Sequence, residues 1–215
     1  MNNFWEQSWS TVDLARVNSY IGSSTLSSDP VIAYLKNQQV KTVCDAGCGC
    51  GAYALRLAAN HFQVSGFDIS STAAEMAKKL LESKGIYNAD FRAADILATG
   101  YADGQFDAVV SRDVIDHMPL RDGAAAVREL CRITKDGGTV VLTLDRSDVE
   151  YEMEPHTING DGDYLFSDGK WKGMVFHPYS EEQIPLLVQD KVVKRLEIGS
   201  EGFLLFLSKT YGGHT

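Results

Sequence analysis

Short apolar runs alternate with segments of helical periodicity between about residues 41 and 145. A short apolar run bounded by turn residues indicates a buried strand, and apolar residues recurring every three or four positions indicate an amphipathic helix. The pattern predicts strands at 41–46, 62–68, 89–95, 105–112 and 135–145, with helices at 51–60, 71–85 and 121–134. Such alternation is typical of a doubly wound, mostly parallel α/β sheet with helices on both faces.

The remaining segments complete this pattern and then break it. A helix is predicted at 180–190, where Ser180 and Glu182 or Gln183 form a capping box, and strands follow at 191–198 and 202–209. The glycines at 199 and 202 indicate a hairpin, which makes the last strand antiparallel to its neighbour. In the helix at 71–85, Ser71 or Thr72 is expected to cap the start and Gly85 to end it.

Residues 146–179 interrupt the alternation with glycines, acids and five large aromatics, which are Tyr151, Tyr164, Phe166, Trp171 and Phe176. An irregular connection of this length is usually a lid or binding loop, although an insertion that packs on its own aromatics is the alternative. We therefore expect one domain over 1–215. Its parts are an N-terminal helical cap (1–40), a core (41–145), a substrate-side insertion (146–179) and a C-terminal helix with a hairpin (180–211).

Composition narrows the choice of partners. The net charge is −9 and no Lys/Arg cluster occurs, which argues against nucleic acid and favours a small molecule. No run of 18 apolar residues and no secretory signal is present, so we expect a cytoplasmic protein without a membrane partner, as a monomer or homodimer. Three of the four cysteines are spaced C-x3-C-x-C, unlike the paired C-x2-C of zinc sites, so no metal is expected.

The turn "DAGCGCG" (45–51) follows the first strand, where open α/β sheets bind ligands. Its glycines read G-x-G-x-G, with Ala52 at the last position of the dinucleotide fingerprint G-x-G-x-x-G. Asp68 ends the second strand, where an acid can accept hydrogen bonds from ribose hydroxyls. Asp95 ends the third, positioned for an adenine amino group, whereas Asp45 is expected to shape the turn. Together these features indicate an adenosine-containing ligand.

With these motifs, residues 40–145 resemble the class I (Rossmann-like) methyltransferases that use S-adenosylmethionine (SAM), of the type acting on small molecules. The segments that carry the resemblance are "VCDAGCGCG", "VSGFDIS", "AADI", "FDAVVSRDVIDHM" and "LCRITKDGGTVVLTL". The resemblance implies a seven-stranded sheet with the last strand antiparallel between strands five and six. It also implies cofactor contacts by Gly47, Cys48, Gly49, Asp68, Ile69, Asp95, Ile96, Ser111 and Arg112. The N-terminal "FWEQSW" is similar to a segment whose aromatics close over SAM in some members; Trp5, Trp9 and Tyr20 are the candidates, with core packing as the alternative.

A general base is needed only for an acceptor that arrives protonated. His117 is the first candidate because its ordinary pKa lies near 7, and Asp113 and Asp116 follow. The alternative for His117 is a surface or capping role. His156 and His177 could face the acceptor. The aromatics of the insertion favour an apolar or planar acceptor, and its acids favour an amine. Methyl transfer to a small molecule competes with a SAM-binding module without turnover and, less well, with a nicotinamide-dependent oxidoreductase, against which the missing third fingerprint glycine counts.

Overall fold

A seven-stranded sheet lies at the centre of the computed structural model, which describes residues 4–13, 29–146, 149–199 and 202–209. The strand order is β3-β2-β1-β4-β5-β10-β9, with only β10 antiparallel to its neighbours. The strands are β1 (Thr42–Ala46), β2 (Gln63–Asp68), β3 (Asp90–Ala93), β4 (Phe106–Ser111), β5 (Thr134–Asp145), β9 (Val192–Ile198) and β10 (Gly202–Ser208). The fold class predicted from the sequence is therefore confirmed, including the antiparallel strand between the fifth and sixth parallel strands.

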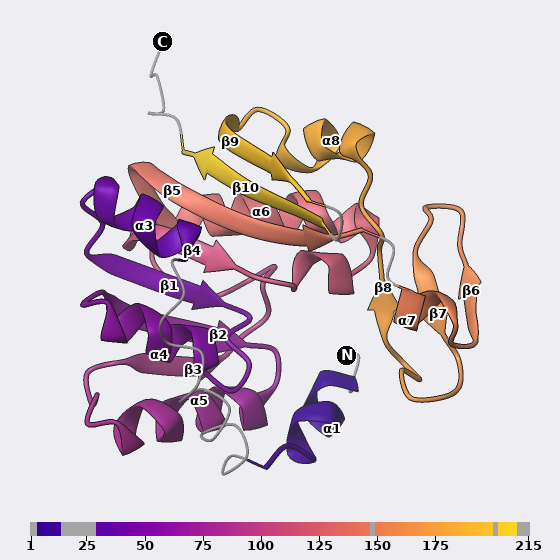
Figure 1. The fold of residues 1–215 in the computed structure, drawn as a ribbon, viewed down its shortest axis with the longest axis horizontal. Helices are drawn as coiled ribbons and strands as arrows, with labels where there is room; N and C mark the ends of the chain where they lie inside the picture. Colours follow the sequence, from indigo (N-terminus) through magenta and orange to yellow (C-terminus); the bar gives the residue numbers. More distant parts are fainter. Residues whose placement is uncertain (1–3, 14–28, 147–148, 200–201, 210–215) are drawn as a thin grey trace.

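Helices cover both faces of the sheet (Figure 1). On one face α3 (Pro30–Asn37), α4 (Ala52–Ala59) and α5 (Ser71–Ser83) bury apolar side chains against β1, β2 and β4. On the other face α6 (Leu120–Ile133) and α8 (Ile184–Val188) pack on β4, β5 and β10. Burying both faces explains why the central strands are almost continuously apolar. Of the expected N-terminal cap, α3 belongs to this core, whereas α1 (Phe4–Ser10) packs beside α5.

Two helix termini differ from the sequence prediction. The cap of α5 is Ser70, whose hydroxyl accepts from the N–H of Ala73, so Ser71 and Thr72 lie inside the helix. Gly85 follows the helix with a positive φ of 79°, as predicted. The helix expected at 180–190 is a 3-10 turn, Glu181–Gln183, followed by the short α8, because Pro185 can occupy only a first-turn position. The predicted capping box between Ser180 and Gln183 is present.

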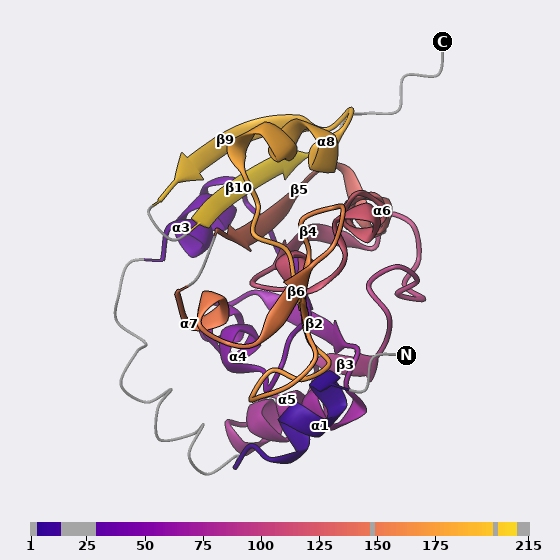
Figure 2. The ribbon, with the colours of Figure 1, turned by 90° about the vertical axis from the view of Figure 1, so that its right-hand side faces the viewer.

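Residues 146–179 contain regular secondary structure, so the prediction of an irregular connection was wrong. The insertion contains α7 (Val149–Glu152) and a three-stranded antiparallel sheet of β6 (His156–Ile158), β7 (Tyr164–Phe166) and β8 (Val175–Phe176). Phe166, Met174 and Phe176 form its buried centre, and Phe4 and Trp5 of α1 pack against them. The arrowheads of β1, β4 and β5 point toward the side of the molecule that carries α1 and the insertion (Figure 1). Figure 2 shows this side face on.

Candidate functional site

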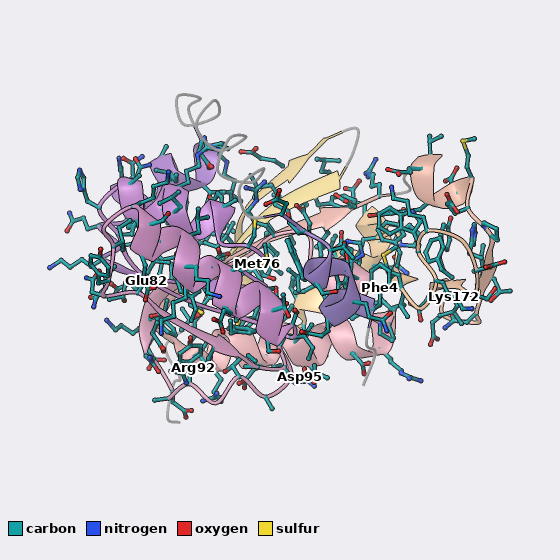
Figure 3. The ribbon with its side chains drawn as sticks, turned by 90° about the horizontal axis from the view of Figure 1, so that it is seen from below. Phe4, Met76, Glu82, Arg92, Asp95 and Lys172 are labelled. Carbon is teal, nitrogen blue, oxygen red and sulfur yellow. The ribbon has the colours of Figure 1, made fainter. Side chains whose placement is uncertain are left out.

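A cavity of about 370 Å³ lies at the carboxyl ends of the parallel strands. Its described lining comes from α1, the glycine turn, the ends of β2 and β3, the segment after β4, and β8. The lining residues are Trp5, Trp9, Gly47, Phe67, Asp68, Ile69, Ala94, Asp95, Ile96, Leu97, Asp113, Val114, His117, Met118, Pro119 and Val175. Figure 3 shows Asp95 and Phe4 toward the end of α5 that adjoins α1, while Glu82 and Arg92 lie toward the other end.

The glycine turn presents backbone to this cavity because side chains do not fit there. Gly47 has a φ of +76°, and a Cβ on it would overlap the Cγ2 methyl of Val114. Gly49 has a φ of +50°, and its Cβ would lie 2.7 Å from the indole ring of Trp9. Only glycine adopts such conformations without strain. The glycines therefore let Val114 and Trp9 pack directly against the main chain of the turn, and Gly47 lines the cavity.

Asp68 links the turn to the end of β2. Its carboxylate oxygens accept hydrogen bonds from the N–H groups of Gly49 and Ser70, each at 2.9 Å. Burial raises the pKa of Asp68, and the two N–H donors act in the opposite direction. Each carboxylate oxygen has a second lone pair and can accept one more hydrogen bond. Asp95 is exposed at the end of the neighbouring strand, where Oδ1 accepts from the N–H of Leu97.

Helix α1 is held over the cavity by Glu6. Its carboxylate accepts hydrogen bonds from the hydroxyls of Ser70 (2.7 Å) and Thr72 (2.5 Å), at the N-terminus of α5. These hydroxyl donors lower the pKa of Glu6 to about 2. Negative charge is favourable at a helix N-terminus. Trp5 and Trp9 on the same helix consequently line the cavity, whereas Tyr20 lies outside the described residues.

His117, in the segment after β4, also lines the cavity and is enclosed by aromatic rings. The ring centroids of Trp5, Phe176 and Tyr151 lie 5.0, 5.7 and 6.1 Å from its own. Burial lowers the pKa of His117 to about 4, although nearby Asp145 and Asp113 favour the charged form. The imidazole is therefore neutral near pH 7. Its Nδ1 atom is buried and has no hydrogen-bond partner among the described residues.

The two carboxylates considered with His117 differ in position. Asp113 lines the cavity with a φ of +54°, and its Oδ1 accepts a hydrogen bond from the Thr143 hydroxyl at 2.6 Å. Asp116 is fully buried and is absent from the described cavity lining. Burial raises the pKa of Asp116 to about 7, and its Oδ2 accepts from the N–H of Asp145. Asp113 is thus the carboxylate that can meet a ligand.

Several other predicted residues are not among the described residues that line the cavity, namely Cys48, Gly49, Ser111, Arg112, His156 and His177. Burial raises the pKa of the Cys48 thiol far above its ordinary value, so the thiol is unreactive. Arg112 is exposed and its guanidinium lies 4.5 Å from the ring centre of Tyr53. His156 stacks on Tyr164 within the insertion. Within the described ranges, no three His, Cys, Asp or Glu side chains form a group that could hold a metal ion.

Sequence reasoning missed Glu6 and the enclosure of His117. The hydroxyl residues at 70–72 signalled a helix start, but no local pattern connects them with an acid 64 residues earlier. The aromatic content of 151–176 was noted, yet its contact with His117 depends on the antiparallel pairing of β7 and β8.

The strand order, the glycine turn after β1 and the acids after β2 and β3 define a class I SAM-dependent methyltransferase fold, as the motifs predicted. Residues 43–138 match the family described as a methyltransferase domain.

Two curated relatives and one solved structure illustrate the similarity. The chain is 33% identical over 109 residues to the chloroplastic tocopherol O-methyltransferase of Arabidopsis thaliana, covering 50% of this chain and 31% of that protein. It is 32% identical over 120 residues to the 2-heptyl-1-hydroxyquinolin-4(1H)-one methyltransferase of Mycobacteroides abscessus, covering 54% and 52%. The chain thus spans about a third to a half of these relatives. A SAM-dependent methyltransferase structure from Methanosarcina mazei shares the fold at 23% identity and a TM-score of 0.70, covering 86% and 99%.

Proposed function

We propose that this chain is a SAM-dependent methyltransferase whose acceptor is a small, uncharged, planar or apolar molecule with a hydroxyl group. The observation that carries the proposal is one cavity that joins Asp68 and Asp95, at the ends of β2 and β3, to the neutral His117. The other candidates, a binding module without turnover and a nicotinamide-dependent oxidoreductase, remain outcomes of the experiment below.

The residues around the glycine turn fit SAM. The Asp68 and Asp95 carboxylates suit a ligand with ribose hydroxyls and an amino group, and Ile69 and Ile96 supply apolar surface beside them. Ser111 Oγ, at the end of β4, is buried and has no hydrogen-bond partner among the described residues. The residues to which we assign cofactor contacts are Gly47, Cys48, Gly49, Asp68, Ile69, Asp95, Ile96, Ser111, Arg112 and Trp9. When bound, SAM supplies a methyl group made electrophilic by its sulfonium.

The acceptor class follows from the charged and apolar side chains that line the cavity. The described lining carries the carboxylates of Asp68, Asp95 and Asp113 and no Lys or Arg, which disfavours an anionic acceptor. The acids of the insertion are not among the lining residues, so they give no support to an amine acceptor. Trp5, Met118 and Pro119 offer apolar contact instead. The names of the two relatives above also refer to aromatic acceptors.

In this proposal His117 accepts the proton of the acceptor hydroxyl. The imidazole is neutral near pH 7, and Nδ1 has no hydrogen-bond partner among the described residues, so this nitrogen is the atom assigned to accept the proton. Asp113 is the second candidate. Trp5 and Trp9 exclude water from the reacting groups, which strengthens electrostatic interactions there.

The wider assignment is a single domain in the cytoplasm, monomeric or homodimeric, that acts without nucleic acid or membrane. The net charge of −9 supports the proposal that the protein acts without nucleic acid. In the part of the chain that the structure describes, no helix combines the length and hydropathy needed to span a bilayer.

Calorimetric titration with S-adenosylhomocysteine tests the cofactor, after mass spectrometry has excluded a copurified ligand. We expect micromolar binding that Asp68→Ala weakens about 10- to 100-fold, because partner groups lose a charged acceptor. Glu75→Gln, in an exposed ion pair with Lys79 on α5, is the control and should change nothing. Absence of binding by the wild type, or binding of NADH instead, overturns the proposal.

Incubation with methyl-labelled SAM and a panel of acceptors tests the reaction. We expect label on uncharged phenols and hydroxyquinolines, and a rate that falls at least 100-fold in His117→Leu. Label only on amines or carboxylic acids contradicts the acceptor class. Cofactor binding without label on any compound supports the module without turnover.

A further inference from the structure

A buried Asp–His pair lies between the insertion and the start of α6. The side chains of Asp163 and His177 are each 1% exposed, and His177 Nδ1 lies 2.9 Å from Asp163 Oδ1. Neither residue is among those that line the cavity, and neither has a part in the function proposed above. A buried charged group persists in a fold only when hydrogen bonds compensate its lost hydration.

The Asp163 carboxylate compensates by accepting from three separate segments. Besides His177, Oδ1 accepts from the N–H of Leu120 at 2.9 Å, and Oδ2 accepts from the Asn159 amide at 2.8 Å. Leu120 is the first residue of α6, whose own N-cap, Pro119, offers no side-chain hydrogen bond. Asp163 therefore caps α6 from 43 residues away, at the end of the helix where negative charge is favourable.

His177 holds the same segment at its other end. Its backbone N–H donates to the carbonyl of Asp116 at 2.7 Å. Its Nε2 lies 3.2 Å from Gln183 Oε1, which already accepts from the N–H of Ser180. The two ring nitrogens thus contact Asp163 on one side and Gln183 on the other, so the imidazole is fixed from both ends.

These contacts bracket residues 116–120. Between the two fixed points lie His117, Met118 and Pro119, which form the acceptor-side wall of the cavity. We propose that Asp163 and His177 form a positioning clamp that fixes residues 116–120, and with them the ring of His117, against the cavity. The effect of the clamp on catalysis rests on the proposed function, whereas its effect on the position of residues 116–120 does not.

Amide hydrogen exchange on the full chain, without any acceptor, tests the clamp. We expect Asp163→Asn to lower protection at Leu120 and across 116–120 at least 10-fold, because an amide cannot accept from all three donors. The affinity for S-adenosylhomocysteine should stay within twofold, since the glycine turn and Asp68 are untouched. Asp161→Asn, an exposed acid in the same turn, is the matched control and should change neither. Unchanged protection at 116–120, or an equal loss in β1 and β5, overturns the proposal.

A pair of substitutions at His177 keeps the test decisive if Asp163→Asn fails to fold. In His177→Asn the amide can take the place of Nδ1–H and donate to Asp163, so protection at Leu120 should remain near that of the wild type. His177→Leu cannot donate and should lose it. Equal behaviour of the two variants contradicts the clamp. Once an acceptor is known, His177→Leu should lower kcat for methyl transfer while cofactor affinity stays unchanged; failure of methyl transfer in the wild type would leave the exchange result standing.

Discussion

The two sides of the cavity are built in different ways. The cofactor side, formed by the ends of β1, β2 and β3, uses backbone N–H groups and carboxylates at fixed places after successive strands. The acceptor side, formed by Trp5, residues 113–119 and the insertion, uses rings and hydrogen bonds from segments far apart, such as Leu120 with Asp163 and Trp5 with His117. The first side is specified by short motifs that each follow one strand, and the second by tertiary packing. Substitutions on one side should therefore leave the other intact.

The largest effect is expected from Gly47→Ala. A Cβ there costs about 1–2 kcal/mol in the left-handed region and also overlaps Val114. We expect the affinity for S-adenosylhomocysteine, measured by calorimetry, to fall at least 100-fold, while exchange protection in β6–β8 is retained.

Gly85→Ala is the control for this substitution. Gly85 also has a positive φ, of 79°, but a Cβ would meet nothing within 4 Å. It should cost stability without changing cofactor affinity. Equal losses of affinity in the two variants would mean that the turn is not a binding surface.

A smaller effect is expected on the acceptor side, where His117 should make the stability of the fold depend on pH. Folded His117 stays neutral down to about pH 4, because burial lowers its pKa, whereas the unfolded chain takes up this proton near pH 6.5. Between these values the unfolded state binds more protons, so stability falls as the pH is lowered through that window. The contribution is about 3 kcal/mol.

Urea unfolding of the wild type and His117→Leu at pH 7 and pH 4 measures this contribution. The wild type should lose about 3 kcal/mol relative to the variant between the two values. Other buried acids, such as Asp45 and Asp116, are present in both proteins, so their contributions cancel in the difference between the two free energies of unfolding. If the difference in free energy of unfolding between the two proteins is the same at both pH values, the His117 ring is not enclosed.

The smallest effect belongs to Glu6, which connects the two sides. Glu6→Gln removes the charge that Ser70 and Thr72 stabilise, so α1 should be held less firmly over the cavity. We expect about three- to tenfold weaker binding of S-adenosylhomocysteine and a change in tryptophan fluorescence, since Trp5 and Trp9 lie on this helix. Gln7→Ala, at an exposed position on the same helix, should have no effect. Identical affinities for Glu6→Gln and wild type would separate α1 from cofactor binding.

The same contrast explains what could be predicted from the sequence. The strands and helices from 41 to 145 follow from periodicity, and the glycine turn and strand-end acids follow from their fixed places in such a sheet. Asp68 and Asp95 were found in this way, and both line the cavity. Trp9 was predicted from the resemblance as a residue near the cofactor, and its indole ring packs against Gly49. Their roles in binding stay predictions until the titration is done.

The rest could not be predicted, for physical reasons. The strands of the insertion have only two or three residues, too few for periodicity to show. The cap of α5 moved to Ser70 because three hydroxyl residues in succession compete for one position. Asp163 was read as one acid among several, and nothing near it in the sequence indicates that it caps α6.

The interior position of β10 bears on how the chain acquires its fold during synthesis. The strand pairs with β5 and β9 on its two edges, and Phe203, Leu205, Phe206 and Leu207 are almost completely buried. Until residues 202–208 have left the ribosome, β5 presents an open apolar edge, and such edges promote association with other chains. The nascent chain therefore depends on β10 for protection, and a premature stop before residue 202 should produce aggregation rather than a smaller working domain.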